Sequence, residues 1–161
     1  LYFLILSSTA NAGCDDPITE GVDYTKCKFS DGQDLQGSFL PNSNLSFASF
    51  IQVNLDKSIM MNSNLAFGTF SESSFIRANL YESTLTGANF EQSNFTSANL
   101  TRADFMGATL IDVNFQNSNL MEANFTSSNI LNANFEGANL IGATWTNGEV
   151  CGPDSIGTCN K

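Results

Sequence analysis

The residues with the clearest chemical potential are four cysteines, which form two pairs near the two ends of the chain. Cys14 and Cys27 make the first pair and Cys151 and Cys159 the second, with no cysteine between the pairs. Two chemistries fit: disulfide bonds in an oxidising compartment, or one zinc ion held by four thiolates. Neither pair has the short spacing of zinc ligands, so disulfides are favoured. Three connectivities stay open, and pairing between neighbours closes the shortest loops.

Catalytic chemistry finds little support in the composition. The 161 residues include no His, which removes the commonest general base and metal ligand. The sixteen Asp and Glu are dispersed, and no pair of them has a partner base. We therefore expect no enzyme, no catalytic residue, no metal site and no cofactor. The formal net charge of −10 argues against binding a nucleic-acid backbone or an anionic membrane.

One five-residue pattern fills the middle of the chain, and the structure that it forms must position the cysteine pairs and the charged residues. From Leu35 to Trp145 every fifth residue is large and apolar, at 23 consecutive positions. Two positions before each stands a small residue, mostly Ala or Ser, and one position before stands mostly Asn or Asp. A period of five fits neither an amphipathic helix nor a plain strand, so the pattern predicts a solenoid.

The pattern also assigns a direction to each side chain. Side chains alternate along an extended segment, so large and small residues that both point inward leave the Asn between them outside. The other two residues of each unit can then turn a corner. Asn and Asp suit such corners, and stacked amides can form ladders. We expect these Asn residues to have a structural rather than a ligand-binding role.

This consensus, seen in Ala98-Asn99-Leu100 and Ala133-Asn134-Phe135, resembles the A(D/N)Lxx repeat of pentapeptide repeat proteins of the exported bacterial or cyanobacterial type. The resemblance implies an all-β fold, a right-handed quadrilateral parallel β-helix with four pentapeptides per twenty-residue coil. On that geometry the repeats make about six coils. The sequence alone leaves coil size open, because alternation over ten residues fits almost as well as columns of twenty.

The chain is predicted to have four parts: a signal-peptide remnant (1–12), an irregular N-terminal cap (13–34), the repeat β-helix (35–145) and a C-terminal capping loop (146–161). The apolar start followed by Ala10-Asn11-Ala12 predicts cleavage after Ala12, although a lipid anchor on Cys14 is an alternative. Six residues rather than five separate Phe29 from Leu35, so we expect the register to slip there.

Several outward positions are unusually apolar and form a candidate interface. Its occupant could be residues 14–34, a second copy or another protein, and a surface without any contact is also open. In a nearby column Glu82, Arg102 and Glu122 could pair or could remain solvated. The candidate interface residues are Phe39, Ile59, Met61, Tyr81, Phe47, Phe67, Met121 and Ile141, with Pro41 beside them.

These observations predict a non-enzymatic, exported scaffold that presents flat β faces to a protein partner or to itself. We expect the periplasm, the thylakoid lumen or the cell exterior, with no bound nucleic acid and no membrane insertion. Family resemblance also implies an alternative, a DNA mimic that inhibits a type II topoisomerase. The predicted export signal disfavours this alternative, because an exported protein would not meet that enzyme.

Overall fold

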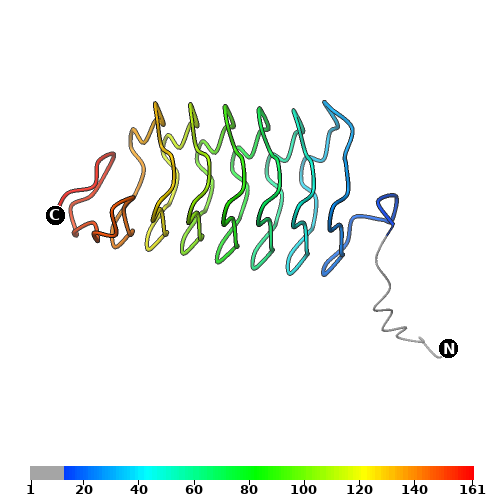
Figure 1. Cartoon of the computed structure of the whole chain (residues 1–161), viewed down its shortest axis with the longest axis horizontal. Helices are drawn as coiled ribbons and strands as arrows, with labels where there is room; N and C mark the ends of the chain where they lie inside the picture. Colours follow the sequence, from blue (N-terminus) through cyan, green and yellow to red (C-terminus); the bar gives the residue numbers. More distant parts are fainter. Residues whose placement is uncertain (1–12) are drawn as a thin grey trace.

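The computed structural model describes residues 13–161, and the predicted signal-peptide remnant in residues 1–12 lies outside them. The described chain winds as a stack of coils along one axis (Figure 1). Within residues 13–161 there are no helices, and the strands are reduced to single-residue bridges between coils. Accordingly, no helix in this range is long and apolar enough to cross a bilayer.

The bridges fix the size of a coil, which the sequence left open. Asn79 pairs in parallel with Asn99, and Asn99 pairs with Asn119, so each coil takes twenty residues and four pentapeptide sides. A side in the interior of the stack makes three backbone hydrogen bonds with the next coil, one of them at the corner, where the Glu82 N–H donates to the Thr101 carbonyl (3.0 Å). On this side, the Leu80 N–H donates to the Asn99 carbonyl (2.8 Å) and the Asn99 N–H donates to the Ala78 carbonyl (2.9 Å).

The register changes once, near the start. Asp23 pairs with Asn44 and Lys28 with Ser49, an offset of 21 residues, whereas Asp34 pairs with Asn54 at an offset of 20. The extra residue therefore lies between Lys28 and Asp34. This confirms the slip predicted from the six-residue spacing of Phe29 and Leu35.

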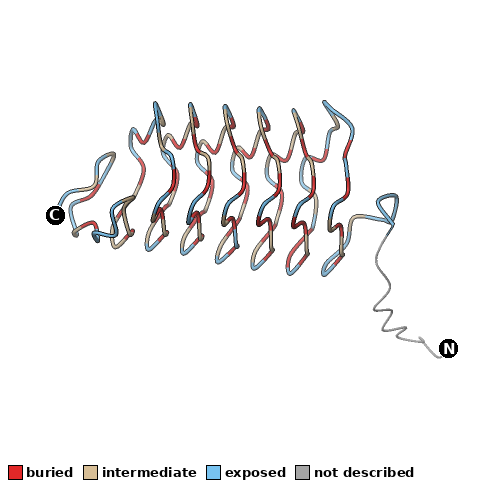
Figure 2. Ribbon diagram, in the orientation of Figure 1, coloured by how far each residue is buried: buried red, intermediate tan, exposed pale blue. Residues whose placement is uncertain are grey.

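The large residues of the repeat form the core along the axis of the stack, and buried segments recur from coil to coil in Figure 2. Leu100, Phe115 and Leu120 are fully buried. Phe115 stacks on Phe95 at 5.4 Å between ring centroids and meets Phe105 edge-on at 5.7 Å. Such stacked and edge-on pairs are the favoured arrangements of aromatic rings. Trp145, at the last repeat, is only partly buried.

The Asn residues hold the corners and link the coils. The Asn124 Oδ1 accepts the Thr126 N–H (3.0 Å), a side-chain turn that shapes the corner. Its Nδ2 donates to the Asp104 carboxylate one coil earlier (2.9 Å), and Asn99 donates likewise to Asn79 (3.0 Å). The predicted structural role of these residues is confirmed.

Both ends carry a disulfide. Cys151 is bonded to Cys159, and the chain there pairs antiparallel with the last coil through the Asn139–Ile156 and Thr144–Val150 bridges. At the other end Cys14 is bonded to Cys27, which ties residues 13–19 to the first coil.

Candidate interaction surface

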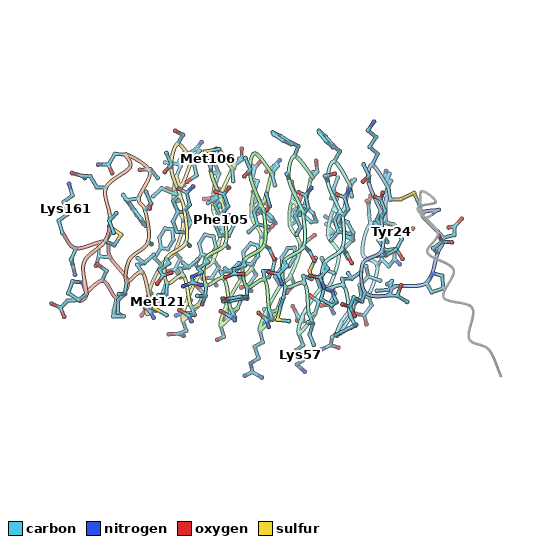
Figure 3. All side chains as sticks on the ribbon, turned by 90° about the horizontal axis from the view of Figure 1, so that it is seen from below. Tyr24, Lys57, Phe105, Met106, Met121 and Lys161 are labelled. Carbon is cyan, nitrogen blue, oxygen red and sulfur yellow. A yellow bond between two sulfur atoms is a disulfide. The ribbon has the colours of Figure 1, made fainter. Side chains whose placement is uncertain are left out.

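The outward apolar residues of the first coils lie on one side of the rod and on the two corners that follow it. We call this set the apolar surface: Phe39, Ile59, Met61, Tyr81, Phe47 and Phe67. Phe39, Phe47 and Phe67 expose 49%, 55% and 56% of their surface, whereas the other three are half-buried. Met121 and Ile141 continue the corner column of Met61 and Tyr81 and are also half-buried. Figure 3 shows Met121 near the C-terminal part of the rod.

Phe47 and Phe67 occupy the same corner in successive coils. Their rings stack at 5.3 Å with an angle of 17° between the planes. Both residues have a positive φ, 59° and 58°, a conformation that bulky side chains rarely adopt. The Phe67 N–H donates to the Thr86 carbonyl (3.0 Å), so the corner is held by the coil stack rather than by the preference of the side chain.

Pro41 corrects one expectation. It was expected beside these residues on the outside, but it is buried. The Gly21 N–H donates to the Pro41 carbonyl (2.9 Å), so the irregular N-terminal segment around Gly21 lies beside this corner. Residues 14–34 leave Phe39, Phe47 and Phe67 exposed. They therefore do not cover the apolar surface.

A polar network borders the apolar surface at the Tyr81 corner. Arg102 lies 3.1 Å from the Glu82 carboxylate and 2.7 Å from that of Glu122, so these side chains pair, although the sequence favoured a solvated column. The Tyr81 hydroxyl donates to the same Glu82 oxygen (2.7 Å). This hydrogen bond, followed by that from Arg102, holds the pKa of Glu82 below its ordinary value. In return, the bond to Glu82 raises the pKa of Tyr81.

Several exposed apolar residues were not singled out from the sequence: Met106, Leu131, Val150 and Ile156. Met106 follows a buried Phe just as Met61 follows Met60, so the position in the repeat could have indicated it. Val150 and Ile156 lie in the C-terminal segment, where the five-residue pattern has ended. Within residues 13–161, no group of three or more Cys, Asp or Glu side chains is placed to hold a metal ion.

Comparison with known proteins agrees with this architecture. The sequence profile of the family described as Pentapeptide repeats matches residues 34–66, 73–112 and 103–142, with eight copies. No curated protein matches the sequence.

Among solved structures, the chain is similar to HetL, a pentapeptide repeat protein involved in heterocyst differentiation regulation in the cyanobacterium Nostoc sp.. The two share 22% identity over 81% of this chain and 70% of HetL, with a TM-score of 0.61. Full-length QnrB1, a plasmid-mediated fluoroquinolone resistance protein, shares 20% identity over 86% of this chain and 79% of its own, with a TM-score of 0.52. At these identities the likeness shows a shared fold. The repeat profile covers more than half of the residues, and the chain belongs to the pentapeptide repeat family.

Proposed function

We propose that this protein is a non-enzymatic, extracytoplasmic scaffold of about six coils that binds another protein through its apolar surface. Members of the family are generally structural or interaction scaffolds rather than enzymes. The observation that supports this proposal best is the exposure of Phe39, Phe47 and Phe67 to solvent. Burying a large apolar side chain contributes about 1.5–3 kcal/mol, so a partner that covers these rings gains substantial free energy.

The two disulfides support an extracytoplasmic location. Cys14–Cys27 and Cys151–Cys159 use every cysteine of the chain. Disulfides persist in the periplasm, in comparable lumenal spaces and outside the cell, and are rare in the cytoplasm. The export signal predicted in residues 1–12 points the same way.

The topoisomerase alternative receives less support. A net charge of −10 suits a DNA mimic, but such a mimic needs rows of like charge. Here the corner column of Glu82, Arg102 and Glu122 alternates in sign. The likeness to QnrB1 rests on the fold.

The test compares the double variant Phe47→Asp with Phe67→Asp against a matched control, Met106→Asp with Leu131→Asp. All four side chains are exposed, and each pair adds two negative charges. Wild-type protein produced in an extracytoplasmic compartment is crosslinked there, and its crosslinked species are compared with those of both variants. We expect the Phe47/Phe67 variant to lose a crosslinked species that the control keeps.

Two further measurements make this test decisive. Sedimentation of the purified protein separates self-association from binding to another protein. Unfolding curves check that both variants remain folded. If both variants keep every crosslinked species, the apolar surface is not the interface.

A further inference from the structure

We propose that the N-terminal end of the rod holds an extended, basic segment of a partner protein in a groove outside the apolar surface. The groove has a volume of about 610 Å³ and lies between residues 14–18 and 28–33. The Cys14–Cys27 disulfide ties the two walls together. Tyr24 and Phe29, which close the end of the core, also line it.

Unpaired backbone groups mark this end as a site for an added strand. In the interior, the residue at each Asn position uses both its N–H and its C=O to bond the preceding coil, as Asn99 does with Ala78 and Leu80. Lys28 holds this position in the first coil and lines the groove. Its N–H and C=O make no hydrogen bond to any residue of the described range. They can therefore pair with an extended chain.

The opposite end shows how such an edge is satisfied in this fold. There the Gly142 N–H donates to the Cys151 carbonyl (2.9 Å) and the Cys151 N–H donates to the Ala143 carbonyl (2.8 Å). The C-terminal segment thus pairs antiparallel with the last coil. By the same geometry, an extended segment in the groove would form hydrogen bonds with the backbone N–H and C=O of Lys28. Its side chains would point alternately toward the aromatic floor, formed by Tyr24 and Phe29, and toward the walls.

Charge selects the occupant. Three carboxylates line the groove, those of Asp15, Asp16 and Asp31, against one ammonium group, that of Lys28. None of the ion pairs among residues 13–161 involves these four side chains. A second copy would bring the same carboxylates and a net charge of −10, which opposes end-to-end pairing. A segment that alternates apolar and basic residues can pack its apolar side chains on Tyr24 and Phe29 and pair its basic side chains with the carboxylates of the walls. Its backbone can hydrogen-bond the N–H and C=O of Lys28, which are free within the described range.

A labelled peptide of alternating Val and Lys provides the probe, and the same peptide with Glu in place of Lys is its control. Fluorescence anisotropy with the full chain should show binding of the Lys peptide alone, weakening as salt is added. The double variant Asp15→Asn with Asp31→Asn should bind roughly tenfold more weakly. Glu91→Gln with Asp154→Asn removes the same charge elsewhere and should leave binding unchanged.

Amide hydrogen exchange separates strand pairing from loose attraction of charges. The bound Lys peptide should slow exchange at the Lys28 amide but not at Asp23 or Phe39, which lie at the same end and do not line the groove. Equal binding of the Glu peptide, equal loss in the control variant or an unchanged Lys28 amide would overturn the proposal. The Phe47→Asp with Phe67→Asp variant should still bind the peptide, so the two proposals can fail separately.

Discussion

The ring of Phe67 lies against Gly87, one coil further along the same corner. A Cβ placed on Gly87 would lie 2.6 Å from Cε1 of Phe67, closer than two non-bonded carbon atoms can approach. The ring of Phe47 stacks on the other side of Phe67. The exposed Phe47–Phe67 pair therefore packs against Gly87, a residue without a side chain.

Gly87→Ala should displace this aromatic pair. Gly87 and Gly107 occupy the same corner with similar φ, 64° and 66°, but a Cβ on Gly107 meets nothing within 4 Å. Gly107→Ala should therefore cost only the left-handed backbone conformation, about 1–2 kcal/mol. Gly87→Ala should cost more, because the Phe67 ring must also move.

Chemical unfolding of both variants measures that difference. In a Phe67→Ala background the two glycine substitutions should become equally costly, since the clash is gone. If Gly87→Ala and Gly107→Ala are equally destabilising in the wild-type background, the ring does not hold the position that the structure gives it.

The core should respond far more strongly than the surface. Phe115 is fully buried and stacks between Phe95 and Phe135, at 5.4 Å and 5.1 Å. Phe115→Ala should lower the free energy of unfolding by about 3–5 kcal/mol, because it removes ring contacts and leaves a cavity. Met106→Ala, at an exposed corner, should change it by less than about 0.5 kcal/mol. Similar losses in the two variants would contradict an axial core.

The five-residue period was enough to predict which side chains face inward, because one large residue per unit can only be buried if every unit makes the same turn. Leu100 and Phe115 bear this out. It could not predict the coil of twenty residues, since coil size depends on how many sides close the ring, and no single side chain encodes that number. The slip before Leu35 was visible because it breaks the spacing itself.

Asp56 shows a contact between coils that the pattern did not reveal. Ser74 stands where most units have Asn, and it has no amide oxygen to accept the corner N–H. The Asp56 carboxylate, from the preceding coil, accepts the Ile76 N–H (2.9 Å) and the Ser74 hydroxyl instead. Asp56→Ala should therefore cost about 1–3 kcal/mol, because it leaves these donors unpaired.

A second substitution tests this explanation. In a Ser74→Asn background the new side chain can accept the Ile76 N–H itself, as Asn54 does for the N–H of Asp56 (3.0 Å). Asp56→Ala should then cost less, and a double-mutant cycle from unfolding curves gives the coupling. Additive losses would show that Asp56 does not replace the missing Asn.

The candidate interface was only partly readable from the sequence. The repeat position placed Phe39, Phe47 and Phe67 outside, and they are exposed. It also placed Pro41 outside, but burial there depends on the path of the irregular chain near Gly21. The groove at the N-terminal end could not be foreseen for the same reason, because residues 14–18 follow no repeat.

The Tyr81 corner should depend on pH. The pKa of Glu82 is lowered first by the Tyr81 hydrogen bond and then by Arg102, so Tyr81→Phe should raise it toward its ordinary value. Because the folded pKa is the lower one, these contacts stabilise the protein above the unfolded pKa of Glu82. That contribution is lost as the pH falls through the folded pKa.

Carboxyl titration by NMR measures the pKa of Glu82 in the wild type and in Tyr81→Phe. Glu149 is the internal control, because its pKa is lowered chiefly by Lys161 at the C-terminal end. It should not respond to the Tyr81 substitution. If the pKa of Glu82 stays where it was, the hydrogen bond from Tyr81 is absent in solution.

The C-terminal segment should need its disulfide to stay paired with the last coil. The Cys151–Cys159 bond closes a loop with a sequence separation of 8 residues, and losing it should cost about 2–3 kcal/mol in the loop-entropy description. With Cys151→Ser and Cys159→Ser together, the Leu140 and Gly142 amides should exchange faster, because they donate to Ser155 and Cys151 of that segment. The Leu120 amide, which donates to Asn139 within the coils, should exchange much as before. Unchanged exchange at Leu140 and Gly142 would mean that backbone pairing alone holds the segment, and equal acceleration at Leu120 would mean that the disulfide supports the whole stack.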